Sequence, residues 1–373
     1  MTPGSRSAAG AGTVRSVGVT YDTGTNFATG QGELSRLVWS RDLMSEEIGA
    51  IRRQLRCRSV TVYGSDLARM ADTASAAVDA GLHVWLQPRL VDRPQREIVD
   101  HLVEAARIAE GLRDAGAPIG LSIGCVHTVF TPGIVPGGRY HERMANIFAD
   151  ADHLVLVPTG VVDFGDANAR LNEFLDRAVR SVRSVFDGET SYAAAPFEDV
   201  DWRLFDSVRL MHFYALAYPA DDAVHARDLA RYHRWGKPVM IAEFGTATHP
   251  RASEMAFLSF DVVDRGGAVH RVNEGVLRDE HAQAAFHRRM LNVFERAGLH
   301  GATVSEFIHP THPHSTDSRL DLDVASMALV KSIREDHLDP ASSYRWEPKE
   351  AFRALAARNA RFAGHDTDLR LPG

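Results

Sequence analysis

The segment Lys237–Gly245, with the sequence KPVMIAEFG, is the most informative stretch of the chain. Its four consecutive apolar residues, Val239 to Ala242, are typical of a parallel strand that is buried on both faces. Glu243 follows at the point where the apolar run ends, and Gly245 lets the backbone turn away. The pattern predicts a carboxylate at the C-terminal tip of a buried strand, although a solvated turn residue gives the same local pattern.

Composition narrows the class of protein. The chain has 373 residues, of which 45% are apolar and 24% are charged, so it can build one large barrel or two smaller domains. The net charge of −7, without basic blocks interleaved with aromatic residues, argues against nucleic-acid binding. No apolar run approaches the roughly 18 residues that span a bilayer. We therefore expect a small-molecule substrate, with no nucleic-acid or membrane partner.

The chain ends and the cysteines suggest a compact cytoplasmic protein. Residues 2–12, TPGSRSAAGAG, are small and lack the apolar region of a signal peptide, which predicts a disordered tail over residues 1–14. A single catalytic domain is expected over residues 15–365, followed by a short tail over 366–373. Cys57 and Cys125 fall in or beside predicted strands, where a thiol behaves as a small hydrophobe, so we expect no disulfide and a reducing compartment.

From Ser16 onward, short apolar strands alternate with amphipathic helical segments, the pattern of a parallel sheet covered by helices. Eight such units predict a single-domain (β/α)8 barrel. A doubly wound open sheet is disfavoured because residues 21–32, YDTGTNFATGQG, contain no GxGxxG motif. The predicted strands are Ser16–Tyr21, Ser59–Tyr63, His83–Gln87, Ile119–Ile123, Thr190–Ala194, Ser207–His212, Pro238–Ala242 and Ala302–Ser305. The predicted helices are Glu46–Leu55, Asp66–Asp79, Gln95–Asp114, Ala169–Phe186, Ala223–Trp235, Glu280–Ala297 and Val324–Asp336.

Two connections are much longer than the others. One runs from Thr131 to about Asn168 after the fourth strand, and the other from Thr246 to about Arg278 after the seventh. Long loops inside a compact domain are usually functional, and those that follow strands lie on the face where barrel enzymes have their active sites. The first loop contains an apolar run, His153–Pro158, that can form an additional strand.

Titratable or polar residues recur where predicted strands end. Each of them alone can cap a turn or satisfy a local hydrogen bond. Together they are expected to converge on one pocket, because the carboxyl ends of parallel strands meet at one edge. These residues are Asp22, His127, His212, Tyr214, Glu243, Glu306 and His309.

Glu243 and Glu306 end neighbouring strands of the predicted barrel. Adjacent strands are about 4.8 Å apart, and retaining glycosidases use two carboxyl groups about 5–5.5 Å apart. The pair therefore fits a site in which one carboxylate is a nucleophile and the other an acid and base.

Other motifs are weaker. His309, His312 and His314 have a spacing that can chelate zinc, but no partnering Cys or carboxylate motif accompanies them, so we expect a stiffened pocket wall, no metal and no cofactor. Trp39 is a candidate for stacking on a sugar, with core packing as the alternative, and Asp22, His212 and His309 are candidates for substrate binding. The absence of GxSxG, P-loop and HExxH motifs argues against α/β-hydrolases, P-loop NTPases and zincins.

With these residues in view, the chain resembles clan A of the glycoside hydrolases, which are (β/α)8 enzymes that retain anomeric configuration. The segment KPVMIAEFG is similar to their seventh strand, whose Glu is the nucleophile, and this resemblance implies that role for Glu243. Met211–Tyr214, MHFY, resembles the end of their sixth strand and implies that Tyr214 contacts the nucleophile. Residues 319–331 and 346–352 are similar to the closing segments of such barrels. The overall pattern also resembles actinobacterial proteins labelled abortive-infection proteins.

One departure from this family pattern is informative. Clan A enzymes carry an acid/base Glu at the end of the fourth strand, usually after an Asn, whereas this chain reads Gly124-Cys125-Val126-His127-Thr128. General acid/base assistance is worth about 10²–10⁴-fold, so another group has to replace the missing carboxylate. His127, which titrates near neutral pH, and Glu306 are the candidates.

Three hypotheses follow for the function. The first is a retaining glycosidase that acts on a small glycoside, with Glu243 as nucleophile, Tyr214 orienting it, and His127 or Glu306 as acid and base. The second is a glycosidase-fold enzyme repurposed for cyclisation, isomerisation or elimination in small-molecule or natural-product metabolism. The third is an inactive carbohydrate-binding protein, which is disfavoured because mere binding gains little from an acid at the end of a buried strand.

Overall fold

The structure, a computed structural model, describes residue 14 and residues 16–26, 34–149, 161–212 and 221–362. Eight parallel strands close into a barrel in the order β1-β10-β7-β6-β5-β4-β3-β2. Each predicted strand is present, with ends within two residues of the predicted ones, so the (β/α)8 prediction is confirmed. The strands are β1 (Ser16–Asp22), β2 (Ser59–Gly64), β3 (His83–Pro88), β4 (Ile119–Cys125), β5 (Thr190–Ala194), β6 (Val208–Met211), β7 (Val239–Phe244) and β10 (Gly301–Val304).

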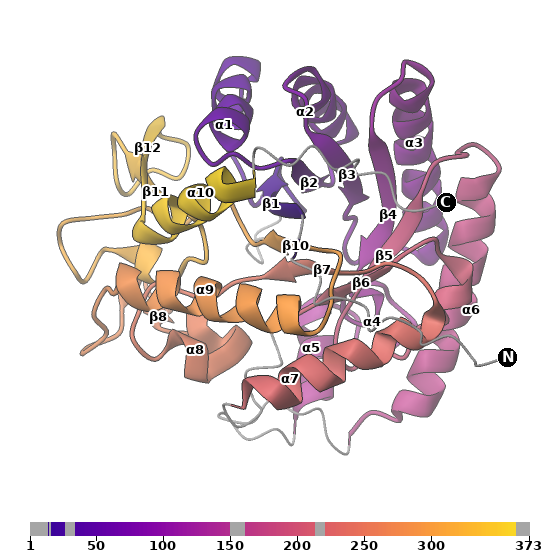
Figure 1. The fold of residues 1–373 in the computed structure, drawn as a ribbon. Helices are drawn as coiled ribbons and strands as arrows, with labels where there is room; N and C mark the ends of the chain where they lie inside the picture. Colours follow the sequence, from indigo (N-terminus) through magenta and orange to yellow (C-terminus); the bar gives the residue numbers. More distant parts are fainter. Residues whose placement is uncertain (1–13, 15, 27–33, 150–160, 213–220, 363–373) are drawn as a thin grey trace, which may run out of the picture.

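Helices surround the barrel (Figure 1). Several begin at a side chain that accepts a hydrogen bond from the first turn, namely Ser40, Asp66, Asp163, Asp221 and Asp279, and such caps fix where a helix starts. The longer helices are α1 (Arg41–Arg53), α2 (Leu67–Asp79), α3 (Gln95–Asp114), α6 (Phe164–Arg183), α7 (Asp222–Ala230), α9 (Glu280–Arg296) and α10 (Glu350–Phe362). Short 3-10 turns lie at η1 (Trp202–Leu204) and η3 (Arg231–Trp235).

Apolar side chains of the strands face the helices and form the main core, whereas the inside of the barrel holds polar and bulky groups. The Arg209 guanidinium lies over the Trp85 ring, with its central carbon 4.0 Å from the ring centroid. Gly120 makes room for this ring, because a Cβ there would lie 2.9 Å from it. The barrel interior is therefore filled by side chains and is not an open channel.

The two long connections contain further elements. After β4 come α4 (His127–Phe130) and α5 (Tyr140–Phe148), while the predicted extra strand at His153–Pro158 lies outside the described residues. After β7 come α8 (Ala252–Met255), η4 (Ala256–Phe260) and a hairpin of β8 (Val263–Asp264) with β9 (Arg271–Val272). Residues 1–13 of the predicted N-terminal tail, residues 363–365 of the predicted domain and the predicted C-terminal tail, 366–373, are also outside the described part. Val14, which was predicted to lie in the disordered tail, is buried in the core.

The helix predicted over Val324–Asp336 is wrong. The chain forms a 3-10 turn, η5 (Leu322–Ala325), and then β11 (Val330–Arg334), which pairs antiparallel with β12 (Tyr344–Pro348). The N–H groups of Leu329 and Val330 donate to the carbonyls of Glu306 and Phe307, so this apolar run extends along the segment that follows β10. Tertiary hydrogen bonds thus override a helical pattern, and the closing helix is α10.

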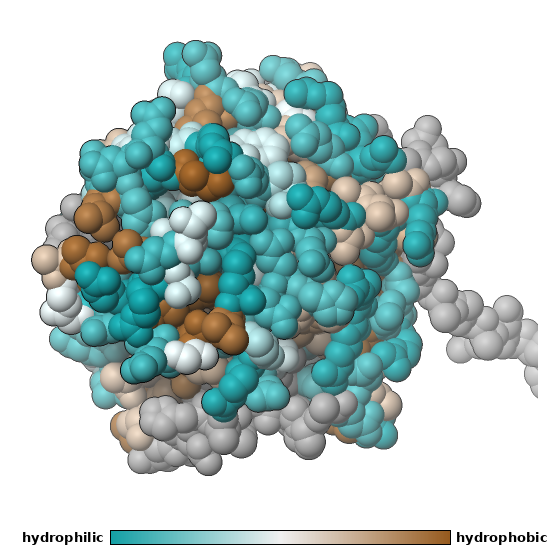
Figure 2. All heavy atoms as spheres, turned by 90° about the vertical axis from the view of Figure 1, so that its left-hand side faces the viewer, coloured by the Kyte–Doolittle hydropathy of each residue, from teal (hydrophilic) through white to brown (hydrophobic). Residues whose placement is uncertain are grey.

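Figure 2 shows the face that carries β11, β12 and the adjoining ends of α8 to α10. Apolar residues on this face form small separate patches among hydrophilic ones. Among the described residues, the large apolar side chains that are more than half exposed are Val161, Leu277 and Leu338. None of the described helices is both long and apolar enough to cross a membrane.

Candidate active site

Glu243 reaches the mouth of the barrel because β7 contains an extra residue. Leu210 and Met211 of β6 are the partners of Ile241 and Glu243, so β7 advances two residues while β6 advances one. The extra residue of β7 is also seen on its other side, where Ala302 and Val304 of β10 pair with Ile241 and Phe244, so β7 advances three residues while β10 advances two. Such a bulge re-aims the side chains that follow it, which places Glu243 toward the site although Ile241 faces the core.

Arg89 is the main partner of Glu243 and was not predicted from the sequence. It follows β3, and its Nη2 donates to Glu243 Oε1 and, at 2.9 Å, to Gln87 Oε1. Its guanidinium carbon lies 3.7 Å from the centroid of the Tyr63 ring at the end of β2. The side chains of Arg89 and Glu243 are 9% and 4% exposed, so the ion pair is shielded from water.

Glu306 follows β10 and is held by two neighbours. The Tyr63 hydroxyl donates to Glu306 Oε2 at 2.7 Å, and His309 Nδ1 lies 2.6 Å from Glu306 Oε1. Burial alone would raise the pKa of Glu306, but the adjacent His309, together with the Tyr63 hydrogen bond and Arg89, brings it below its ordinary value. Burial opposes the charge of His309, yet Glu306 raises the pKa of this imidazole above its ordinary value. The pair is therefore a carboxylate beside an imidazolium.

The pKa values of the other two carboxyl groups, Glu243 and Asp22, are raised above their ordinary values, unlike that of Glu306. Burial raises the pKa of Glu243, Arg89 offsets part of this rise, and the negative charge of Glu306 adds to it. Burial and Glu306 also raise the pKa of Asp22, whose oxygens accept hydrogen bonds from Gly24 N at 2.8 Å and from the Ser35 hydroxyl. Asp22 therefore holds its own loop together at the edge of the site. We call the group of residues linked by these interactions the carboxylate cluster: Asp22, Tyr63, Arg89, Glu243, Glu306 and His309.

His127 lies behind the barrel wall, which corrects its predicted role as acid and base. Its Nε2 bonds to the carbonyl of Ile123 at 2.9 Å and its Nδ1 to the hydroxyl of Thr131 at 2.7 Å. The ring stacks on Tyr192 and meets Phe174 of α6 edge-on. Burial lowers the pKa of His127 to about 4, so this neutral ring, with both nitrogens occupied, is a packing residue.

His212 also faces away from the carboxylate cluster, which corrects its predicted role in substrate binding. Its ring packs on Phe294 of α9 and on His225 of α7, and burial lowers its pKa to about 3. Trp39 is half-buried beneath Arg69 of α2, whose guanidinium carbon is 5.4 Å from its ring. Tyr214 lies outside the described residues.

Cys125 occupies the end of β4, where the family resemblance leads one to expect a carboxylate. Its environment is set by burial, which raises the pKa of its thiol to about 12, and by the charges of Arg89 and Glu243. The thiol is thus protonated and lies beside the carboxylate cluster.

The histidines that follow β10 take different partners. His309 pairs with Glu306, and His314 Nδ1 lies 2.9 Å from Asp321 Oδ1. The His312 ring meets His309 edge-on, and Arg265 Nη2 lies 3.4 Å from its Nε2. Within the described ranges, no three His, Cys, Asp or Glu side chains come together in an arrangement that can hold a metal ion.

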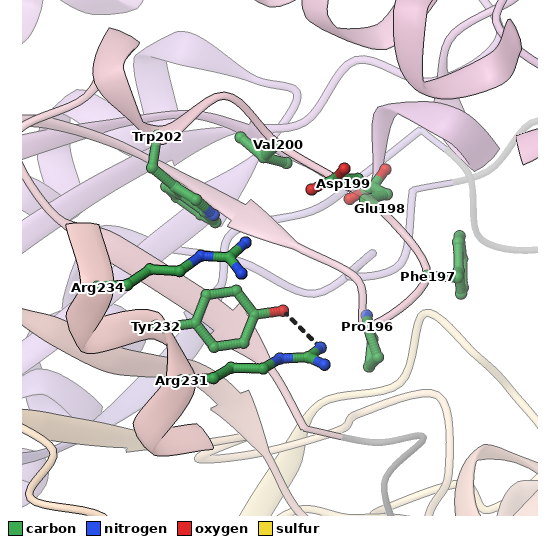
Figure 3. A pocket seen from close by; sticks show the side chains of 9 residues that line it. All are labelled: Pro196, Phe197, Glu198, Asp199, Val200, Trp202, Arg231, Tyr232 and Arg234. Carbon is green, nitrogen blue, oxygen red and sulfur yellow. Dashed lines mark hydrogen bonds between the residues drawn. The ribbon is translucent and has the colours of Figure 1, made fainter. Parts of the chain in front are cut away.

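A separate pocket of about 260 Å³ lies beside the segment that follows β5 (Figure 3). Arg231, Tyr232 and Arg234 of η3 point toward that segment from one side. Glu198, on the other side, accepts hydrogen bonds from Thr128, Tyr192 and Ala195, and burial raises its pKa to about 7. The pocket shares no lining residue with the carboxylate cluster. It is lined by Pro196, Phe197, Glu198, Asp199, Val200, Trp202, Arg231, Tyr232 and Arg234.

Comparison with known proteins supports the fold. No model of a protein family matches the sequence, and no curated protein matches it. Among solved structures, the chain is similar to a GH113 β-mannanase from Alicyclobacillus acidocaldarius, with a TM-score of 0.55, 15% identity, and coverage of 94% of this chain and 98% of that one. A β-glucosidase from Pyrococcus furiosus gives a TM-score of 0.54, 10% identity, and coverage of 94% and 95%. A GH5 endoglucanase from Clostridium longisporum gives a TM-score of 0.50, 12% identity, and coverage of 94% of this chain and 97% of that one.

Proposed function

We propose that the chain is a glycosidase-type enzyme that acts on a small glycoside or sugar-containing metabolite by a retaining mechanism. The (β/α)8 barrel of this chain is the fold of several glycoside hydrolases, and at such low identity the likeness extends to the fold alone. The observation that carries this proposal is the pair of buried carboxyl groups at the ends of the adjacent strands β7 and β10, Glu243 and Glu306, with different partners. One carboxyl group is then available as a nucleophile, and the other holds an imidazole that can donate a proton, which suits double displacement.

Glu243 is the nucleophile in this proposal. Arg89 binds one carboxylate oxygen, Oε1, which leaves Oε2 to attack the anomeric carbon. The bond from the anomeric carbon to Oε2 forms while the bond to the leaving oxygen breaks. Arg89 fixes the direction of attack, and the neighbouring charge of Glu306 helps to keep Glu243 basic.

His309 is the acid and base in this proposal. Its raised pKa favours the protonated ring, and a third of its side chain is exposed. Because Nδ1 faces Glu306, Nε2 is the nitrogen that delivers a proton to the leaving oxygen and later removes one from the attacking water. Glu306 then acts through His309: it fixes the ring and stabilises the imidazolium.

A trapping experiment tests this assignment. A panel of 2-fluoro glycosides with highly activated leaving groups is incubated with the protein, and adducts are found by intact-protein mass spectrometry and peptide mapping. These reagents need no acid, so we expect an adduct on Glu243 in the wild type and in His309→Gln. Glu243→Gln is the matched control and should give no adduct. An adduct on another residue, or equal labelling of Glu243→Gln, would refute Glu243 as nucleophile.

A second function is favoured by one observation. Tyr63, Glu306 and His309 form a hydrogen-bonded proton-transfer unit, whereas the end of β4 carries Cys125 and no carboxylate. Such a unit also suits non-hydrolytic proton transfer in a cyclisation, isomerisation or elimination. In that case no glycosyl adduct forms across the panel, and solvent deuterium enters the true substrate or product in a His309-dependent way.

A further inference from the structure

Arg209 crosses the interior of the barrel. It belongs to β6, yet its Nη2 donates to the hydroxyl of Thr61 in β2 at 3.2 Å, and its guanidinium lies over the Trp85 ring of β3. In the order of the strands, β2 stands opposite β6. Because the residue is only 2% exposed and is held at both ends, its positive charge has a fixed place inside the barrel.

This charge is costly to bury. Nε and Nη1 of Arg209 have no hydrogen-bond partner among the described residues, and a buried cation is destabilising unless it is compensated. Burial lowers the pKa of Arg209 to about 10, and the two carboxyl groups that oppose this effect are Glu189 and Glu243. Glu189 precedes β5 at the opposite end of the barrel from Glu243.

The strand register places Arg209 one layer below Glu243. Met211, two residues after Arg209 and on the same face of β6, is the strand partner of Glu243. Arg89 contacts the same carboxylate at the barrel mouth. Glu243 therefore has one guanidinium at the mouth and another beneath it.

The charges around the site show why a second cation is needed. The groups that face Glu243 are Arg89 from β3, Cys125 from β4, Arg209 from β6 and Glu306 from β10, with Tyr63, Asp22 and His309 beyond them. With Asp22, Glu243 and Glu306 ionised, Arg89 and His309 leave one negative charge unbalanced. The imbalance persists when His309 gives its proton to a leaving group, because Glu243 loses its own charge as its bond to the anomeric carbon forms.

We propose that Arg209 is a positioning residue for Glu243: its guanidinium, anchored on Thr61 and Trp85 one layer below, supplies the fixed positive charge that keeps this carboxylate ionised while a substrate occupies the mouth. The catalytic meaning of this inference rests on the proposed function, but the electrostatic effect on Glu243 does not. Arg209 touches no substrate and acts only through Glu243.

The experiment measures the titration of Glu243 itself. Protein labelled with carboxyl-¹³C glutamate is titrated by NMR, and Glu243→Gln identifies the resonance. We expect Arg209→Met to move the titration midpoint of Glu243 to higher pH, because a neutral side chain of similar length leaves the buried carboxylate less compensated. Arg209→Lys should restore most of the wild-type midpoint. Arg143→Met is the matched control, because it removes an equally buried guanidinium that pairs with Asp92 elsewhere.

A second readout separates this inference from the proposed function. If Glu243 forms adducts, labelling of Arg209→Met at a pH one unit below the new midpoint should be about tenfold slower than at the plateau. If the wild type forms no adduct, the proposed function fails, but the NMR titration still tests whether Arg209 lowers the titration midpoint of Glu243. Arg209→Gln replaces the Met variant if that variant does not fold. An unmoved Glu243 midpoint in a folded Met or Gln variant, or an equal shift in Arg143→Met, overturns the inference.

Discussion

His309 Nδ1 and Glu306 Oε1 lie 2.6 Å apart, three residues from one another, at the mouth of the barrel. The short contact pairs a buried carboxylate with an imidazole that still exposes a third of its surface. It brings an imidazole into the carboxylate cluster, whereas the end of β4 carries Cys125 and no carboxylate.

Replacing His309 should separate substrates by their leaving groups. His309→Gln is expected to slow hydrolysis of glycosides with poor leaving groups by about 10²–10⁴-fold, while activated substrates lose little. Because Glu306 raises the pKa of His309, the wild-type basic limb should lie at higher pH than for a free histidine. Steady-state kinetics across pH check this. His314→Gln, whose partner is Asp321, is the control, and an equal loss on both kinds of substrate would contradict the assignment.

A carboxyl group placed at the end of β4 should restore ordinary acid assistance. Cys125 lies beside Arg89 and Glu243, so Cys125→Glu brings a carboxyl group to the cluster from the strand that lacks one. We expect this variant to gain activity on glycosides with poor leaving groups in the His309→Gln background. Cys125→Ser is the size-matched control. If the Glu variant is folded but has no more activity than the Ser variant, the lost-acid explanation fails.

The buried histidines should make the fold acid-sensitive. Burial lowers the pKa of His212 and of His287 to about 3 in the folded protein. An unfolded histidine titrates near 6.5, so below that pH the unfolded chain binds more protons. The stability that depends on these two histidines being neutral is therefore fully present above about pH 6.5, and the free energy of unfolding falls as the pH drops from there toward 3. Each histidine contributes a loss of about 2 kcal/mol at pH 5.

Urea unfolding at pH 7 and pH 5 measures this loss. His287→Leu should show a smaller difference in stability between the two pH values than the wild type, because the substitution removes one of the titrating imidazoles. The substitution breaks no hydrogen bond, since neither ring nitrogen of His287 has a partner in the described structure. An unchanged difference would show that other groups cause the acid sensitivity.

Tyr344 of the C-terminal hairpin bonds to a buried ion pair, Arg36 and Glu47, at the first helix. Arg36 and Glu47 are both fully buried, and Tyr21 and Tyr344 also donate to Glu47, at 2.5 Å and 3.0 Å. Removing one partner strands a charge, so Glu47→Ala should cost about 3–5 kcal/mol in free energy of unfolding. Asp72→Ala, which breaks the exposed pair with Arg41, should change stability little. Chemical denaturation of both variants tests the contrast, and similar losses would contradict it.

The strands were predictable because short apolar runs with β-branched residues appear eight times between helical patterns. The convergence of Glu243, Glu306, His309 and Asp22 on one edge of the barrel was predictable because the ends of parallel strands meet. Arg89 directly follows β3 but was not predicted, because a single arginine after a strand is usually exposed to solvent and its partner Glu243 lies on a distant part of the sequence.

The errors have local causes. Val126 adopts a left-handed conformation, with a φ of 40°, and the short helix it begins turns His127 toward α6. His212 continues the alternation of β6, in which Arg209 points inward, so its outward direction follows from strand parity. Position at a strand end therefore selects candidates, and side-chain parity decides which of them face the site.

The extra residue in β7 has a consequence for comparisons between barrels. Ordinary alternation from Ile241 would point Glu243 to the same side as that core residue, and the added residue reverses the outcome for everything that follows. An alignment that matches the start of this strand and continues without a gap will therefore superimpose Glu243 on a residue of opposite orientation in any barrel that lacks the insertion. Deleting Ala242 would remove this extra residue and leave Glu243 directly after Ile241, on the site side but one position earlier in the strand, so the height of this carboxylate in the barrel depends on the length of the strand.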